Sequence, residues 1–554
     1  MGTNRQPQSS LTLNNVASRT NTTTYDYLGR ATSIRQHGNI TDEIFAEFTH
    51  NANGLLTSIN RYEIDDNNLL TSIANTLYTY NANNAVTSIT HKKPDETSIV
   101  QHSYTYDSTN NILSYLNSLD GSTSYNYDFL GQLISTDYAN QNLTDETYTY
   151  DENGNRLTAN GSNYTTGTNN ELTYDSTYTY TYDSEGNRIS KTNSTYSELY
   201  TWDYRNRLTK VTQQEYNTET QEWTTTQIVE YAYDYNNVWI RKTLDTNADG
   251  TADSKSIFIP ENYQTVIQLD DSNLSDEVSP TVTHHYLWTP QTQDKLLADT
   301  TTDGVLWTLT DHLGSIRDII QQTSSSLVVP AHIIYDAYGN VISCKDSTGQ
   351  TVENPILFGY TGKAFDADTQ LQNNINRWYD AAIGRWLSTD PIGFNGNDTN
   401  LYRYVGNRSP QTLDILGLID IKKYNQICAM CAKLQESGVC KEVSTAKCIE
   451  TLEEVYDIAQ KAWIFPYQTD TCWKWVGAFL TIFDSKLAKP SSPVTATMIH
   501  WEYYAHGGAT TDHYAVKISF CQGSIVIYFD NTGWGDDIYH DFMEDQIPRD
   551  AIRR

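Results

Sequence analysis

Polar and apolar residues alternate with a period of two through much of the first 240 positions. Thr179–Tyr182 reads Thr-Tyr-Thr-Tyr, and Arg207–Val211 reads Arg-Leu-Thr-Lys-Val. A period of two places successive side chains on opposite faces of an extended chain, and Thr, Tyr and Val favour strands. The alternation therefore predicts a series of short β-strands.

An aromatic residue followed by Asp recurs between these predicted strands. The copies are Tyr25-Asp26, Tyr106-Asp107, Tyr127-Asp128, Tyr150-Asp151, Tyr182-Asp183, Trp202-Asp203, Tyr233-Asp234 and Tyr335-Asp336. Most are followed by Gly or Asn, which tolerate the positive φ of a tight turn. Hairpins repeated at a spacing of about 20 residues bury their apolar faces only by joining their neighbours, which predicts a continuous sheet or β-solenoid.

The pattern changes after residue 418. Helical spacing of apolar residues predicts helices over 424–434, 446–463 and 473–483. Strands are predicted at 495–504, 513–520 and 524–529. Helices followed by an antiparallel sheet indicate a small α+β domain.

Length and composition are those of a folded, multidomain protein. A chain of 554 residues with 38% hydrophobic residues is too long for one ordinary core. It contains no apolar run of 18 residues, so stable membrane insertion is not expected. Residues 1–11 lack a basic region followed by an apolar one, so export would need either a route other than an N-terminal signal peptide or a region upstream of this sequence.

Charge and cysteine usage narrow the classes of function. The net charge is −31, and residues 419–554 contribute 13 basic and 18 acidic side chains. Nucleic-acid binding rests on Lys and Arg, so this balance argues against it. Only Cys344 lies before residue 419, so the repeat array does not depend on disulfides; the other six cysteines follow. Cys428-x-x-Cys431 belongs to a spacing that suits a compact zinc site poorly, and we expect neither metal nor cofactor.

Residues 377–418 form a block with its own sequence pattern, here called the core-ending block. Its conspicuous positions are Arg377, Tyr379, Asp380, Gly384, Arg385, Leu387, Ser388, Asp390, Pro391, Ile392, Gly393, Asn400, Tyr402, Tyr404, Asn407, Pro410, Asp414, Gly417 and Leu418. In this order they resemble the block that ends the core of bacterial Rhs/YD-repeat proteins. Ile415 departs from that pattern, which has Pro at this position.

The resemblance implies a spiral β shell around a C-terminal toxin, and a self-cleavage that frees the toxin. The matching aspartates are Asp390 and Asp414, the matching orienting arginine is Arg385, and the cut would follow Leu418. Two carboxylates held close together can act as an acid and a base, because one retains a proton while the other activates water. The chemistry of the residues alone favours a structural role, in which both aspartates cap turns; the resemblance is what favours self-cleavage.

Residues after 418 carry a second set of candidate catalytic groups. Cys472-Trp473 opens a predicted helix, His513 opens a predicted strand, and Asp530 and Asn531 follow the next strand before Trp534-Gly535. A helix N-terminus stabilises a thiolate, and a histidine held by Asp or Asn can serve as its base. The order resembles papain-fold cysteine enzymes. We therefore expect Cys472, His513 and Asp530 to be catalytic, with Asn531 as the alternative third residue.

Together these observations predict three segments: a YD-repeat β shell (1–376), a self-cleaving block (377–418) and a papain-like effector (419–554). The effector would attack amide bonds of a target-cell protein as a protease, deamidase or transglutaminase. The resemblance also implies a cognate immunity protein, delivery by bacterial secretion machinery and action in the target cytoplasm. Two other hypotheses stay open: a nuclease or NAD-directed effector, and a non-enzymatic adhesion protein.

Overall fold

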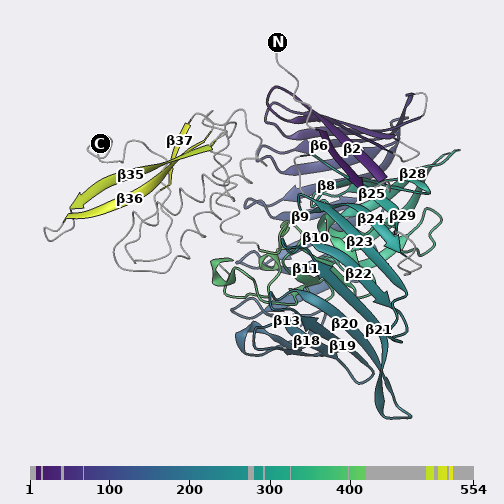
Figure 1. Cartoon of the computed structure of the whole chain (residues 1–554). Helices are drawn as coiled ribbons and strands as arrows, with labels where there is room; N and C mark the ends of the chain where they lie inside the picture. The colour runs from purple at the N-terminus through teal and green to yellow at the C-terminus, as the bar shows by residue number, and fades with distance from the viewer. Residues whose placement is uncertain are drawn as a thin grey trace. The chain divides into compact units, whose positions relative to one another are not determined.

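The computed structural model describes residues 8–13, 17–38, 43–65, 68–271, 280–290, 294–324, 326–396, 398–418, 494–504, 510–520 and 523–527 (Figure 1). The chain divides into two compact units. The first comprises Met1–Tyr25 and Ala31–Lys423, and the second comprises Asp26–Arg30 and Tyr424–Arg554.

The first unit begins with a 14-stranded antiparallel sheet in which each strand pairs with the next along the chain. Its strands are β1 (Gln8–Leu13), β2 (Ala17–Tyr25), β3 (Ala31–Gly38), β4 (Glu43–His50), β5 (Leu56–Ile64), β6 (Leu70–Tyr80), β7 (Val86–Lys92), β8 (Ser98–Tyr106), β9 (Ile112–Asn117), β10 (Gly121–Tyr127), β11 (Leu133–Tyr138), β12 (Glu146–Tyr150), β13 (Arg156–Ala159) and β14 (Ser162–Asn163).

A 16-stranded sheet of the same kind follows. Its strands are β15 (Thr165–Thr166), β16 (Leu172–Tyr174), β17 (Thr179–Tyr182), β18 (Arg188–Thr192), β19 (Tyr196–Trp202), β20 (Leu208–Asn217), β21 (Glu222–Tyr233), β22 (Trp239–Asp245), β23 (Ser254–Glu261), β24 (Gln264–Asp271), β25 (Thr281–Trp288), β26 (Leu296–Thr301), β27 (Gly304–Thr310), β28 (Ile316–Gln322), β29 (Leu327–Tyr335) and β30 (Val341–Lys345). The predicted succession of hairpins is confirmed.

Smaller elements complete the described structure. Four short strands form a third sheet: β31 (Ala364–Asp366), β32 (Leu371–Asn373), β33 (Trp378–Asp380) and β34 (Arg385–Trp386). The 3₁₀ turns are η1 (Thr168–Asn170), η2 (Tyr360–Gly362), η3 (Gly393–Gly396) and η4 (Val405–Asn407). In the second unit, β35 (Val494–Tyr504), β36 (Thr510–Phe520) and β37 (Gly523–Ile527) form an antiparallel sheet in chain order.

The Tyr-Asp signature has a physical explanation in the hairpin turns. Asp151 Oδ1 accepts hydrogen bonds from the backbone N–H groups of Asn153 (2.9 Å) and Asn155 (2.8 Å), which closes the turn. The preceding Tyr150 donates its hydroxyl to the carbonyl of Leu133 in the previous repeat, at 2.6 Å. The same donation joins Tyr80 to Leu56, Tyr106 to Val86, Tyr127 to Ile112 and Tyr233 to Leu208. Asp thus shapes its own turn, whereas Tyr fixes that repeat to its neighbour.

The long ribbon of strands turns back on itself, so that β25–β28 pack on β3–β9 through one apolar cluster (Figure 1). Buried polar groups at this contact find partners across it. Arg61 donates to the carbonyl of Thr308 at 3.2 Å, and the Trp307 indole donates to Glu63 at 3.0 Å. The two sheets therefore form one continuous body.

The core-ending block lies along the turns of successive repeats. Its side chains contact one turn after another: Gln411 with Asn111 (2.7 Å), Arg408 with Leu130 (2.7 Å), Asn407 with Gly154 (2.9 Å) and Tyr402 with Gly186 (2.7 Å). Asn376, which directly precedes the block, accepts a hydrogen bond from Asn237 of a further turn (3.0 Å). The turns that tie the repeats together also hold the block.

The three C-terminal strands lie where the sequence predicts them, within a few residues at each end. The predicted helices at 424–434, 446–463 and 473–483 lie outside the described residues, so the α+β prediction stays a prediction. Within the described part of the chain, no helix has the length and apolar character to cross a membrane.

Candidate functional site

Two aspartates of the core-ending block share one guanidinium nitrogen. Arg377, which directly precedes β33, places one Nη 3.0 Å from an Oδ of Asp390 and 3.3 Å from an Oδ of Asp414. The two aspartates are 24 positions apart in the sequence. The structure therefore brings together the two carboxylates that the sequence pattern singled out.

The three side chains of this cluster are almost completely buried. The exposed fractions are 2% for Arg377, 8% for Asp390 and 2% for Asp414. Burial raises the pKa of Asp390 to about 6, although Arg377 opposes the shift; the Asp414 charge adds to it. Burial also lowers the pKa of Arg377, and the two carboxylates offset this only in part. Burial, assisted by the Asp414 charge, thus allows Asp390 to hold a proton at mildly acidic pH.

Asp414 is bonded to the segment that ends at Leu418. Its Oδ1 accepts the backbone N–H groups of Gly417 (2.8 Å) and Leu418 (3.1 Å). Gly417 adopts a φ of +68°, and a Cβ there would lie 2.8 Å from the Asn374 carbonyl oxygen. Only glycine fits this tight turn without strain, because a side chain would meet backbone atoms on the opposite wall.

Arg377 also contacts the peptide group next to Leu418. Its Nε donates to the Gly417 carbonyl at 2.6 Å, and its guanidinium lies 4.1 Å from the centre of the Trp386 ring. The ring covers one face of the guanidinium, which limits its motion. A carboxylate, a carboxylic acid and a fixed cation are thus assembled one residue from the predicted cut, a set that suits peptide hydrolysis.

The expectation that Arg385 orients the two aspartates needs correction. Arg385 donates to the Asn155 side chain (3.2 Å) and to the Asn170 carbonyl, and its guanidinium faces the Tyr402 ring. It ties β34 to the repeat turns instead. Arg377, part of the same matched pattern, is the arginine that meets both carboxylates, but sequence order alone does not distinguish the two.

The second predicted site is described only at His513. This residue is the fourth of β36, the central strand of the C-terminal sheet, and its backbone pairs with Trp501 of β35. Cys472, Asp530 and Asn531 lie outside the described residues, so the thiol site stays a prediction.

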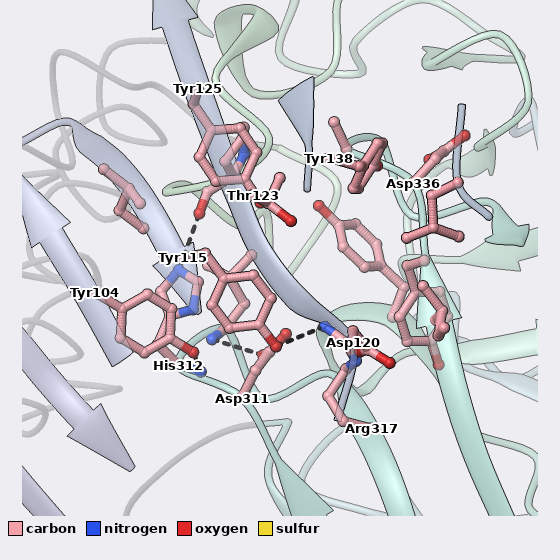
Figure 2. A pocket seen from close by; sticks show the side chains of 18 residues that line it. Tyr104, Tyr115, Asp120, Thr123, Tyr125, Tyr138, Asp311, His312, Arg317 and Asp336 are labelled. Atoms are coloured by element: carbon pink, nitrogen blue, oxygen red, sulfur yellow. Dashed lines mark hydrogen bonds and ion pairs between the residues drawn. The ribbon is translucent and has the colours of Figure 1, made fainter. Parts of the chain in front are cut away.

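A cavity of about 60 Å³ is also present in the first unit, beside the contact of β9 and β10 with β28 and β29 (Figure 2). Tyr104, Tyr115 and Tyr125 line it together with Asp120 and Arg317. Arg317 donates to Asp120 at 2.9 Å and to the Tyr115 hydroxyl at 3.0 Å. Arg317, Asp120 and Tyr115 thus satisfy one another, and the cavity is not lined by Asp390 or Asp414.

Comparison with known proteins finds sequences similar to the repeat array. The sequence profile of the teneurin YD-shell family matches residues 262–410. Salivary gland surface protein 1 of Aedes aegypti is 36% identical over 113 residues, which cover 20% of this chain and 3% of that protein. Double-stranded DNA deaminase toxin A of Burkholderia cenocepacia is 27% identical over 321 residues, 55% of this chain and 21% of that toxin. The chain thus spans a small part of these relatives.

The fold comparison points to the same architecture. The crystal structure of the TcdB2-TccC3-Cdc42 complex superposes with a TM-score of 0.53 and 19% identity, covering 72% of this chain and 22% of that one. At this identity the likeness concerns the fold alone. The family match over 262–410, this likeness of fold and the Tyr-Asp turns together indicate that the first unit resembles YD-repeat shells.

Proposed function

We propose that this protein is an Rhs-type toxin in which the YD-repeat shell cuts its own chain after Leu418 and so frees residues 419–554 as an effector. The observation that supports this most directly is that Asp390 and Asp414 both form an ion pair with Arg377, while Asp414 accepts a hydrogen bond from the N–H of Leu418. A purely structural turn cap explains the Asp414 bonds. It does not explain a second buried carboxylate on the same guanidinium.

The proposed step is hydrolysis of the peptide bond between residues 418 and 419. Asp414 removes a proton from water, and the hydroxide attacks the carbonyl carbon of Leu418. Protonated Asp390 donates its proton to the leaving nitrogen of Ile419, so that the products are a carboxyl group at Leu418 and an amine at Ile419. Arg377 holds both acids in place and orients the adjoining peptide through the Gly417 carbonyl.

Intact-mass measurement of the purified full chain tests this proposal. Wild type should yield fragments 1–418 and 419–554, whereas Asp390→Asn and Asp414→Asn should stay whole. Asp346→Asn is a matched control, because Asp346 closes an exposed turn in which Asn serves equally, as Asn51 does. An uncut wild-type chain, or a cut in either active-site variant at the wild-type rate, contradicts self-cleavage by this pair.

We further propose that residues 419–554 act on amide bonds through Cys472, with His513 as base and Asp530 holding the imidazole. The position of His513 on a central strand supports this, since such strands position a base rigidly. The target is a protein of the recipient cell, and a cognate immunity protein would block the site. Delivery by a secretion system is proposed from the toxin-like shell.

The similarity to the DNA deaminase toxin does not assign a different chemistry to the effector. Only 136 residues follow Leu418, so most of the 321-residue alignment falls within the shell. Expression of residues 419–554 in bacteria tests the thiol mechanism directly. Growth arrest by wild type and normal growth with Cys472→Ala support it. Equal toxicity of the two favours a nuclease or NAD-directed effector, and harmless wild type favours a non-enzymatic terminus.

A further inference from the structure

The segment 414–417, just before the proposed cut, is held through its backbone carbonyls. Each of four consecutive carbonyl oxygens accepts a hydrogen bond from a different side chain. The pairs are Asn374 Nδ2 to Asp414 (2.7 Å), Lys363 Nζ to Ile415 (2.6 Å), Asn376 Nδ2 to Leu416 (2.8 Å) and Arg377 Nε to Gly417 (2.6 Å). All four donors come from one stretch of 15 residues, 363–377.

The donors are themselves held by other side chains. Gln372 donates to the amide oxygen of Asn374 at 2.8 Å, which turns the Asn374 NH₂ group toward the segment. Asn237, in the turn before β22, does the same for Asn376 at 3.0 Å. A donor whose orientation is fixed in advance loses little entropy when it binds its acceptor. The repeat turns therefore help to position the groups that hold the segment.

We propose that Lys363, Asn374, Asn376 and Arg377 form a backbone clamp that sets which peptide bond faces the two aspartates. The clamp recognises main-chain carbonyls and a glycine at 417, and it leaves the side chains at 415 and 416 free to vary. The role of the clamp in cleavage rests on the self-cleavage proposed above. Its hydrogen bonds to the segment 414–417 do not depend on that proposal. Among the four, Asn376 is a positioning residue, because it touches Leu416 and neither aspartate.

The proposal predicts that cleavage does not depend on the side chain at position 415. Position 415 contributes its carbonyl to Lys363, and Pro carries the same carbonyl. Ile415→Pro should therefore cut after Leu418 at a rate within about threefold of wild type, since no donor of the clamp is lost. Cleavage that depended on the side chain at 415 would contradict recognition through the backbone.

Hydrogen exchange measured by mass spectrometry on the full-length chain separates the clamp from the chemistry. The amides of Gly417 and Leu418 are bonded to Asp414, so their exchange reports opening of this segment. We expect slow exchange in Asp390→Asn, which keeps the clamp. In Asp390→Asn combined with Asn376→Leu, exchange across 415–418 should accelerate by at least about tenfold.

A second variant and a control guard against misfolding. Asn376→Asp keeps the size of the side chain but removes the donor, and it should show the same acceleration. Asn142→Leu, made at an exposed position, should leave exchange unchanged, and peptides from β27 and β28 should exchange alike in every variant. In the cleavage-competent chain, Asn376→Leu should slow the cut or spread it to neighbouring bonds.

The outcomes distinguish the two proposals. Wild-type exchange across 415–418 in both Asn376 variants overturns the clamp, even if the chain still cuts after Leu418. An uncut wild-type chain whose segment nevertheless loosens in the Asn376 variants overturns self-cleavage and leaves the clamp standing as a peptide-binding site.

Discussion

The raised pKa of Asp390 makes self-cleavage dependent on pH in a defined direction. Asp390 must carry a proton to release the nitrogen of Ile419, and burial raises its pKa to about 6. Roughly three quarters of the chains hold this proton at pH 5.5 and about 3% hold it at pH 7.5. The cleavage rate should therefore fall by about 25-fold between these two values.

Refolding from urea provides the assay. Uncut chain isolated under denaturing conditions is diluted into buffers between pH 5.5 and 8, and fragment 1–418 is quantified by mass against time. The rate should decline with a midpoint within about one unit of pH 6. Asp346→Asn should show the same profile, because its carboxylate lies in an exposed turn away from the site.

Two results would refute this reasoning. A rate that stays constant from pH 5.5 to 7.5 would mean that Asp390 is not the acid. A rate that rises with pH would mean that its carboxylate form is the active one, and the roles of the two aspartates would be exchanged.

Two further predictions concern the stability of the shell. Gly186 and Gly54 share a φ of +82°, but only at Gly186 would a Cβ meet the core-ending block, 2.6 Å from the Tyr402 hydroxyl. Gly186→Ala should lower the free energy of unfolding by about 1–3 kcal/mol more than Gly54→Ala, measured by urea titration, and equal losses would deny that the block rests on this turn. Burial lowers the pKa of the His332 imidazole, but hydrogen bonds to the carboxylates of Asp120 and Asp318 raise this pKa to about 9. Its stabilisation is complete below pH 6.5 and is lost as pH rises through about 9; the loss should approach about 3 kcal/mol and vanish in His332→Gln.

The parts of the fold that repeat locally could be predicted from the sequence. Alternation located the strands, and each Asp closes a turn within five residues of itself, so its role is visible in a short window. The Tyr of each pair is visible as a signature, but in most pairs its partner is a carbonyl of the preceding repeat. That partner depends on how hairpins stack, which local pattern does not specify.

The aspartate site was predicted in part, and the missing part is a matter of long-range geometry. Asp390 and Asp414 were found because they stand at matched positions of a known pattern. Arg377 and Arg385 stand in that pattern too, eight residues apart, on either side of a tight turn between β33 and β34. One faces the carboxylates and the other faces the repeat turns, and only the path of the chain decides which.

The sequence pattern and the structure lead to different conclusions about the importance of Ile415 for activity. In the sequence, Ile in place of Pro lies next to a proposed catalytic aspartate and counts against activity. In the structure, position 415 presents a carbonyl to Lys363, and Asn374 and Asn376 hold the carbonyls on either side of it. A site that binds main-chain atoms tolerates a change of side chain. Gly417 does not share that freedom, because its φ is +68° and a Cβ there would lie 2.8 Å from the Asn374 carbonyl oxygen. The residue that limits this site is therefore the glycine that fits the pattern, and not the isoleucine that departs from it.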